Sequence, residues 1–342
     1  MAIRMKDIAQ DLGVSVITVS KALRNHRDIS AATKARVLKR VEELNYRPNY
    51  AARALVTGRS HSIGLIVPEL VNSFFSEVAK GLARVLRKSG FSLLISSAEA
   101  DPEVEKSAID QLLARRVDAL LIASSQWTVE AFRRVEEAGV PYILLDRSFV
   151  GLPANFVGVD DVRVGAIATE HLIEIGCRTI AHISGRRIST ASGRLSGYKQ
   201  TLAAHGLPCN PEYIILDDRL EESTHVEGYQ AAVKLLKLNP RPDAIFCFND
   251  AIAIGAMAAI LDAGLRIPDD VALVGCSNLP YDNFLRVPLT SVDQQSVAIG
   301  QRAARLAIRL ITSDRTLPPK TILLDPTLVI RDSTKKHPPA QS

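Results

Sequence analysis

The sequence predicts a small all-α head followed by a two-lobed α/β body built on parallel sheets. Three observations support this prediction. The first 60 residues are cationic and space their apolar side chains as helices do. After Ser62, short apolar runs alternate with amphipathic segments, which is typical of parallel strands joined by helices. There are too many such runs for one sheet, and 342 residues suggest two or three domains.

The stretch from Met5 to Leu55 begins with a helix, a tight turn and a second helix. Gly13 lies where the chain must turn, because glycine adopts positive φ at little cost. Ser15 follows at an N-cap position, and Ser30 can cap a third helix of roughly residues 31–44. The expected head core comprises Ile8, Ala9, Leu12, Val14, Val19, Leu23, Val37, Val41 and Leu44. This pattern is a helix-turn-helix, whose second helix enters the major groove of DNA.

The second helix carries the residues expected to touch DNA. Val16 and Ile17 favour contact with thymine methyl groups, and Lys21 favours guanine O6 and N7. Ser15, Thr18 and Ser20 are placed for phosphates. Residues 1–60 hold 12 Lys/Arg and 5 Asp/Glu, a net charge of +7, so the whole-chain charge of +5 leaves −2 for residues 61–342. A cationic head on a nearly neutral body is typical of a phosphate-binding module.

Two spaced motifs in this head match a known family. D-I-A-x-x-L-G-V-S-x-x-T-V-S-x-A-L, starting at Asp7, and L-N-Y-R-P-N-Y-A-A-R-A-L, starting at Leu44, resemble the head of the lactose-repressor (LacI/GalR) family of bacterial transcription regulators. The resemblance extends to about Asp332. The family usually has Thr as the cap of the first helix, where this chain has Arg4. Asp7 is expected to compensate in part through the helix dipole.

The resemblance implies a hinge helix after Pro48 that forms when two subunits sit on an operator. It places a minor-groove wedge at Leu55, and the DNA contacts expected here are Asn49, Ala52, Arg53 and Leu55. The alternative is an ordinary linker with a stray leucine.

The body is predicted from nine apolar runs separated by helical segments. The runs are Ile63–Val67, Ser92–Ser96, Ala119–Ile122, Tyr142–Leu145, Phe156–Val159, Ile180–Ile183, Tyr213–Leu216, Ala244–Phe248 and Val271–Gly275. The first lobe is expected near residues 62–160 with a return after Ser291, and the second near 162–289 with a last strand at Thr327–Ile330. This arrangement is similar to the periplasmic-binding-protein-like body of the family. The predicted domains are therefore 1–58, 59–334 and a flexible tail at 335–342.

Ligands of open parallel sheets bind beyond the carboxyl ends of the strands. Polar or aromatic residues at such positions are Phe74, Phe75, Asp146, Arg147, Asp160, Asp161, Arg194, Asn249, Asp250, Ser277, Asn278 and Gln294. This set suits a sugar or another small polyol-like effector. Family resemblance implies effector contacts at Phe75, Asp146, Arg147, Arg194, Asn249 and Gln294, and we include Ser277, where many members have aspartate. Alternatively, Asp161 or Asp250 only caps a helix, Phe74 is core, and Arg194 forms a structural ion pair.

Other classes fit the sequence less well. Four scattered cysteines and seven dispersed histidines indicate free thiols and no metal site, so we expect no cofactor. The sequence shows no membrane-spanning run and no signal peptide, which favours a cytoplasmic protein. A solute-binding protein for transport would share the two-lobed body but not the basic head. An enzyme on that body is the third possibility, although no G-x-S-x-G, Walker-type or G-x-G-x-x-G motif occurs. We therefore expect a homodimeric, effector-responsive repressor of a pseudo-palindromic operator.

Overall fold

A computed structural model describes residues 3–23, 25–46, 59–185, 188–216 and 225–335. The chain forms two compact units, Met1–Ser60 and His61–Ser342, which we describe separately. The predicted hinge at residues 49–55 and nearly all of the predicted tail lie outside the described residues.

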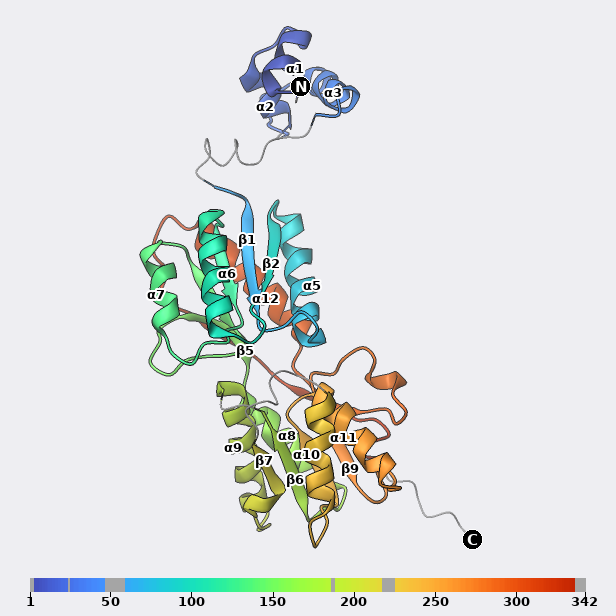
Figure 1. Cartoon of the computed structure of the whole chain (residues 1–342). Coiled ribbons are helices and arrows are strands. Elements are labelled where there is room, and N and C mark those ends of the chain that lie inside the picture. Colours follow the sequence, from blue (N-terminus) through green and yellow to red (C-terminus); the bar gives the residue numbers. More distant parts are fainter. Residues whose placement is uncertain (1–2, 24, 47–58, 186–187, 217–224, 336–342) are drawn as a thin grey trace. The chain divides into compact units, whose positions relative to one another are not determined.

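The head contains the three expected helices, α1 (Met5–Leu12), α2 (Val16–Leu23) and α3 (Ala31–Glu43) (Figure 1). Gly13 adopts φ 64° and ends α1, as predicted. All nine residues expected in the head core belong to its hydrophobic cluster, together with Ala22, Tyr46, Met5 and Ile29. The Ser30 side chain accepts a hydrogen bond from the Thr33 N–H, which confirms the predicted cap of α3.

The start of α1 shows how this chain manages without the usual capping side chain. Arg4 occupies the N-cap, and its guanidinium has no lone pair with which to accept a backbone N–H. Asp7 supplies the reciprocal half of a capping box, because its carboxylate accepts the Arg4 backbone N–H at 2.8 Å. The compensation by Asp7 is therefore a direct hydrogen bond in addition to any dipole effect.

The first lobe of the body is a six-stranded parallel sheet in the order β11-β5-β4-β3-β1-β2. Its strands are β1 (Ser62–Val67), β2 (Ser92–Ser97), β3 (Ala119–Ile122), β4 (Tyr142–Leu145), β5 (Asn155–Val159) and β11 (Thr321–Leu324). Helices α5 (Ser73–Lys88) and α12 (Ser296–Thr312) pack on one face. Helices α6 (Pro102–Ala114) and α7 (Glu130–Glu137) pack on the other. Figure 1 shows these helices around the sheet.

The second lobe is a six-stranded sheet in the order β12-β10-β9-β8-β6-β7, parallel except for the β10–β12 pair. Its strands are β6 (Ile180–Ser184), β7 (Ile214–Leu216), β8 (Ala244–Cys247), β9 (Ala272–Cys276), β10 (Thr290–Asp293) and β12 (Thr327–Val329). Helices α8 (Asp161–Glu174) and α9 (Ser189–Ala204) cover one face, and α10 (His225–Leu236) and α11 (Asp250–Asp262) cover the other. Short 3-10 turns lie at η1 (Pro211–Tyr213) and η2 (Asp282–Phe284).

The chain passes between the lobes three times, after β5, after β10 and after β11. The predicted return to the first lobe after Ser291 was placed slightly early, because β10 still belongs to the second sheet through Asp293. Strand β11, which pairs with β5 and completes the first sheet, was not predicted from the sequence. The two-lobed parallel architecture itself is confirmed.

Helices α8 and α9 approach closely because glycines lie at their contact. A Cβ placed on Gly165 would come within 2.0 Å of the Arg194 carbonyl oxygen, and one on Gly197 within 2.0 Å of the Val162 oxygen. Any larger residue would push the helices apart. This close packing brings the N-terminal end of α8 beside Arg194 on α9.

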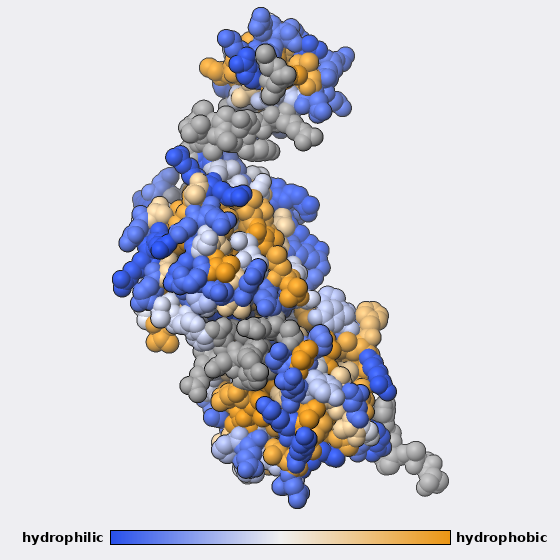
Figure 2. All heavy atoms as spheres, in the orientation of Figure 1, coloured by the Kyte–Doolittle hydropathy of each residue, from blue (hydrophilic) through white to orange (hydrophobic). Residues whose placement is uncertain are grey.

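The surface, the helix lengths and the cysteine side chains bear on whether the chain has a membrane span, a disulfide or a metal site. On the face seen in Figure 2, hydrophilic and hydrophobic residues are intermixed. Within the described parts of the chain, each helix is too short or too polar to cross a bilayer. All four cysteines are free thiols, and the described residues contain no cluster of metal-ligating side chains.

His182 is a fully buried histidine in the middle of β6. Its Nδ1 donates to the Phe246 carbonyl at 2.9 Å, and its ring stacks between Tyr198 and Phe246. Burial lowers the pKa of His182 to about 4, because the charged ring cannot be solvated there.

We expect His182→Phe to flatten the acid side of the stability curve. In the unfolded chain His182 binds a proton near pH 6.5, whereas in the folded protein it does so only near pH 4. The native protein therefore loses up to about 3 kcal/mol of folding free energy as the pH falls through that window. The free energy of unfolding of both proteins should be measured from pH 8 to pH 4. Parallel curves would show that His182 does not titrate on unfolding.

Candidate functional site

The predicted DNA-reading surface is the exposed N-terminal end of α2. Val16 and Ile17 are 41% and 67% exposed, although both are apolar. The Ser15 hydroxyl accepts the Thr18 N–H at 3.0 Å and shares a hydrogen bond with the Thr18 hydroxyl at 2.9 Å. The N-cap predicted at Ser15 is therefore present. Val16 and Ile17 have no part in the head core and are open to a partner.

Lys21 already has an acidic neighbour within the head. Its Nζ lies 2.7 Å from Asp28 Oδ2, and His26 bonds the other carboxylate oxygen. These hydrogen bonds, chiefly the one from Lys21, lower the pKa of Asp28 to about 2. All three side chains are solvent-accessible, and an exposed pair of this kind is weak in water. Lys21 can therefore exchange Asp28 for a base without a large penalty.

The seven residues predicted to contact an effector line one cavity in the body. They are joined there by Asn72, Phe74, Ile188 and Phe248, so that the full lining is Asn72, Phe74, Phe75, Asp146, Arg147, Ile188, Arg194, Phe248, Asn249, Ser277 and Gln294. The lining comes from both lobes, at the carboxyl ends of the parallel strands. Its volume is about 40 Å³, far below the roughly 300–1,000 Å³ typical of ligand sites. The lining side chains therefore leave little free space in this cavity.

Arg194 is held by several contacts around the cavity. It is 3% exposed, its Nε lies 3.0 Å from Asp161 Oδ1, and its Nη1 donates to the Phe248 carbonyl at 2.6 Å. Its guanidinium also stacks 4.5 Å from the centre of the Phe248 ring. Arg194 therefore does form the ion pair that the alternative interpretation expected, and the same side chain also lines the cavity.

Arg147 is held from behind on the first-lobe side. Its Nη1 donates to the Ser124 carbonyl at 2.6 Å, and the Ser124 hydroxyl donates to buried Glu105 at 2.7 Å. Burial raises the pKa of Glu105, against the opposing effect of Arg147 and of its hydrogen bonds. Asp146 precedes Arg147 at φ 62°, a backbone conformation that few non-glycine residues adopt. Backbone strain of this kind is concentrated at functional sites.

The helix caps differ from the alternatives offered by the sequence. Asp160, not Asp161, caps α8 by accepting the Val162 and Arg163 N–H groups. Asn249, not Asp250, caps α11, because its Oδ1 accepts the Ile252 N–H at 2.9 Å. The side-chain oxygen of Asn249 is therefore engaged in the helix cap.

Asp250 does not line the cavity but holds the backbone next to it. Its carboxylate accepts the Ser291 hydroxyl at 2.7 Å and the Leu279 N–H at 3.2 Å, and Asp282 accepts the same N–H at 2.8 Å. Burial and the neighbouring Asp250 raise the pKa of Asp282, which favours a proton shared by the two carboxyl groups. This pair fixes the loop that carries Ser277.

Ser277 and Gln294 form the remaining wall. Ser277 Oγ donates to Gln294 Oε1 at 3.4 Å, and both residues are almost fully buried. Ser277 has φ 137°, so strained backbone recurs on this side of the cavity. A serine here leaves the wall without a carboxylate.

Three lining residues were not predicted as site residues. Phe248 directly follows β8, so the strand-end rule that selected Asn249 applies to it as well. Asn72 caps α5 after β1 and follows the same rule less closely. Ile188 precedes α9, and its apolar side chain gave no signal in the sequence. Phe74 lines the cavity and belongs to the core, so both interpretations offered for it hold.

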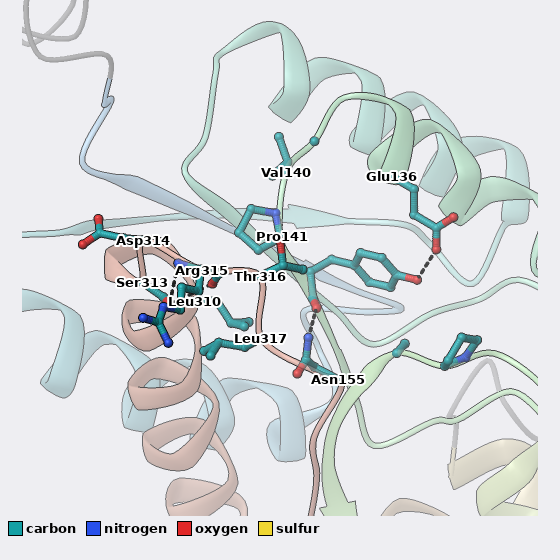
Figure 3. Close-up of a pocket in the computed structure, with 14 residues that line it drawn as sticks. Glu136, Val140, Pro141, Asn155, Leu310, Ser313, Asp314, Arg315, Thr316 and Leu317 are labelled. Atoms are coloured by element: carbon teal, nitrogen blue, oxygen red, sulfur yellow. Dashed lines mark hydrogen bonds between the residues drawn. The ribbon is translucent and has the colours of Figure 1, made fainter.

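A larger groove of about 460 Å³ lies at the opposite, amino ends of β4 and β5 (Figure 3). Tyr142 and Asn155 line it, but their polar atoms are engaged: the Tyr142 hydroxyl donates to Glu136 at 3.0 Å, and Asn155 donates to the Tyr142 carbonyl at 3.4 Å. It contains none of the predicted effector residues. Strand-end geometry and the convergence of charged groups favour the smaller cavity as the effector site.

We expect Arg194→Ala to cost more stability at pH 8 than at pH 5. Burial raises the pKa of Asp161 to about 6 even with Arg194 beside it, and removing the guanidinium must raise it further. At pH 8 Asp161 is charged in the native protein, whereas the variant must bury an unpaired carboxylate or bind a proton to it, at about 3 kcal/mol or more. At pH 5, below the native pKa of about 6, Asp161 is mostly neutral in both proteins and the difference shrinks.

The measurement is the free energy of unfolding at both pH values. Arg194→Ala combined with Asp161→Asn provides the control, in which the pH dependence should disappear. A single-variant loss that is equal at pH 5 and pH 8 would contradict a charged Asp161–Arg194 pair.

Comparisons with known proteins agree with this architecture. Residues 4–49 match the family model of bacterial regulatory proteins of the lacI family. Residues 60–326 match the model of periplasmic binding proteins and the sugar binding domain of the LacI family. The HTH-type transcriptional repressor PurR of Vibrio vulnificus is 32% identical over 334 residues, covering 97% of this chain and 98% of that protein.

Two solved structures give the same result. The Lac repressor dimer bound to operator and the anti-inducer ONPF has a TM-score of 0.84 at 28% identity, covering 98% of this chain and 99% of that one. The transcriptional regulator CelR in complex with cellobiose has a TM-score of 0.73 at 29% identity, covering 97% and 99%. These relatives are transcriptional regulators and not enzymes. With both models matched in one chain, this protein belongs to the LacI family of bacterial DNA-binding transcriptional regulators, with an effector-binding body.

Proposed function

We propose that this regulator represses transcription from a pseudo-palindromic operator and that a sugar or sugar derivative controls it through the cavity of the body. The observation that carries the effector part is the convergence of seven predicted contacts, from separate segments of the chain, on one buried cavity. Its guanidinium, carboxylate, carboxamide and aromatic groups are the ones that fix hydroxyls and stack on sugar rings. The CelR complex contains cellobiose, which supports a carbohydrate-like ligand by analogy.

The DNA part of the proposal rests on α2 and on the basic head. Val16, Ile17 and Lys21 would contact base edges. The hydroxyl groups of Ser15, Thr18 and Ser20 would contact phosphates. The further contacts Asn49, Ala52, Arg53 and Leu55 lie outside the described residues and rest on the motif alone. A homodimer supplies two heads for the two half-sites.

The small volume of the cavity suggests how an effector would act. A ligand shifts a two-state protein only by its different affinity for the two states. At about 40 Å³ the cavity has room for roughly one water molecule, so a sugar needs the lobes to part or the walls to rearrange. We propose that effector binding selects a more open body, and that the hinge and heads respond to that change.

The proposal also assigns the domains: the head with its hinge spans 1–58, the effector-binding and dimerisation body 59–334, and the tail 335–342, most of which lies outside the described residues. The protein acts in the cytoplasm, where its operator is, without a cofactor and without catalysis of its own.

Binding to operator DNA should be steeply salt-dependent and should require the head. Each neutralised phosphate contributes about 0.9 to the slope of log K against log salt, and the head has a net charge of +7 against −2 for the rest. Fluorescence anisotropy on a labelled operator at several salt concentrations, with and without sugars, tests both halves of the proposal. A flat salt dependence, or equal binding by residues 61–342 alone, would contradict DNA binding through the head.

Lys21→Ala should relax the preference at one base position of the operator, at a cost of about 1–3 kcal/mol for the preferred base. The control is Asp28→Asn, which removes the partner of Lys21 in the head while keeping the lysine. That variant should retain the base preference and bind DNA no more weakly than the native protein. Affinities over all single-base variants of the operator measure both effects, and an unchanged preference in Lys21→Ala would remove Lys21 from the reading surface.

A further inference from the structure

One wall of the effector cavity carries a hydrogen-bond donor that has no partner. Gln294 is 2% exposed, and its Nε2 lacks a hydrogen-bond partner among the residues that the structure describes. Its Oε1 is occupied, because it accepts the Ser277 hydroxyl at 3.4 Å. The amide is therefore oriented, with its acceptor used and its donor available to the cavity that it lines. A buried donor left unpaired is costly, so a ligand atom that accepts this N–H is favoured.

The charges of the lining point the same way. Arg147 and Arg194 contribute two guanidinium groups, and Asp146 contributes the only carboxylate among the described lining residues. Asp161 pairs with Arg194 from outside the lining. Glu105 lies behind Arg147, but burial raises its pKa and so disfavours its charge. Arg194 is thus neutralised by Asp161, and the remaining lining groups set the Arg147 guanidinium and the Gln294 N–H against the Asp146 carboxylate.

We propose that the effector is an anionic polyol, a sugar acid whose carboxylate accepts the Gln294 amide N–H, and that Ser277 sets this preference by keeping the wall free of negative charge. This inference rests on the proposed effector role of the cavity and specifies its ligand class. A carboxylate accepts several hydrogen bonds and donates none, which matches the Gln294 N–H and the Arg147 guanidinium.

The test compares matched ligands on the full-length protein. The panel contains glucose, gluconate, glucuronate and glucose 6-phosphate, with the same four forms in the galactose and mannose series. Binding is followed by the melting temperature and by isothermal calorimetry, since a ligand of the folded state raises the melting temperature. We expect an acid of one series to bind about tenfold or more tightly than its neutral sugar, as charged hydrogen-bond partners commonly do.

Ser277→Asp should weaken the acid and leave the neutral sugar equal or better, reversing the preference. Ser277→Ala, which removes the hydroxyl without adding charge, should retain the preference for the acid. Thr316→Asp adds the same charge to the exposed groove at the other end of the first lobe and should not alter ligand choice (Figure 3). The melting temperature without ligand verifies that each variant is folded.

Each contrary outcome has a distinct meaning. If only neutral sugars bind and change operator affinity, the proposed function stands and the anionic effector is wrong. If the phosphate form binds and the carboxylates do not, the anion is a phosphate and the sugar acid is wrong. An unchanged preference in Ser277→Asp would remove Ser277 as the specificity residue. If no member of the panel binds, both the sugar-like effector and the sugar acid fall, while operator binding by the head is unaffected.

Discussion

The buried ion pair between Arg194 and Asp161 connects the parts of the body that form the effector cavity. Asp161 opens α8 directly after the chain leaves β5 of the first sheet, and Arg194 lies on α9 of the second lobe. The same guanidinium binds the carbonyl at the end of β8 and stacks on Phe248. Three segments at one edge of the second lobe are therefore held by one side chain. Such a charge is tolerated in the interior only because each of these contacts is made.

The other lining residues are fixed by polar networks of the same kind. Arg147 is anchored through Ser124, and the Ser277 loop is anchored through the Asp250–Asp282 pair. Gly275 leaves no room for a side chain there, since a Cβ would lie 2.2 Å from Asp250 Oδ1. These groups are not interchangeable with apolar ones of similar volume without changing where the lining side chains point. The lining side chains are thus held in position by contacts outside the cavity.

Much of this was predictable because it depends on local chemistry. Gly13 and Ser15 mark the turn of the head through φ and capping preferences, and continuous apolar runs reveal buried parallel strands. The strand-end rule selected residues that the fold does bring together. Strand β11 was missed because Thr321–Leu324 is a short run with Pro319 and Pro326 close on either side. The Asp161–Arg194 pair and the anchoring of Arg147 join residues far apart in sequence, and no local pattern reports such partners.

The three crossings constrain how the body can open. They lie after β5, β10 and β11, and β10 still pairs with β9 and β12 up to the crossing. Each sheet is covered on both faces by helices and is closely packed, so a movement of the lobes would leave the sheets intact and would be absorbed at the crossings. Gln294 lies in one crossing and is followed by Gln295 at φ 57°. A ligand that binds the Gln294 amide therefore acts on a segment whose backbone must change when the lobes move. The lining residue with an unsatisfied donor is thus also placed to convert ligand binding into lobe movement.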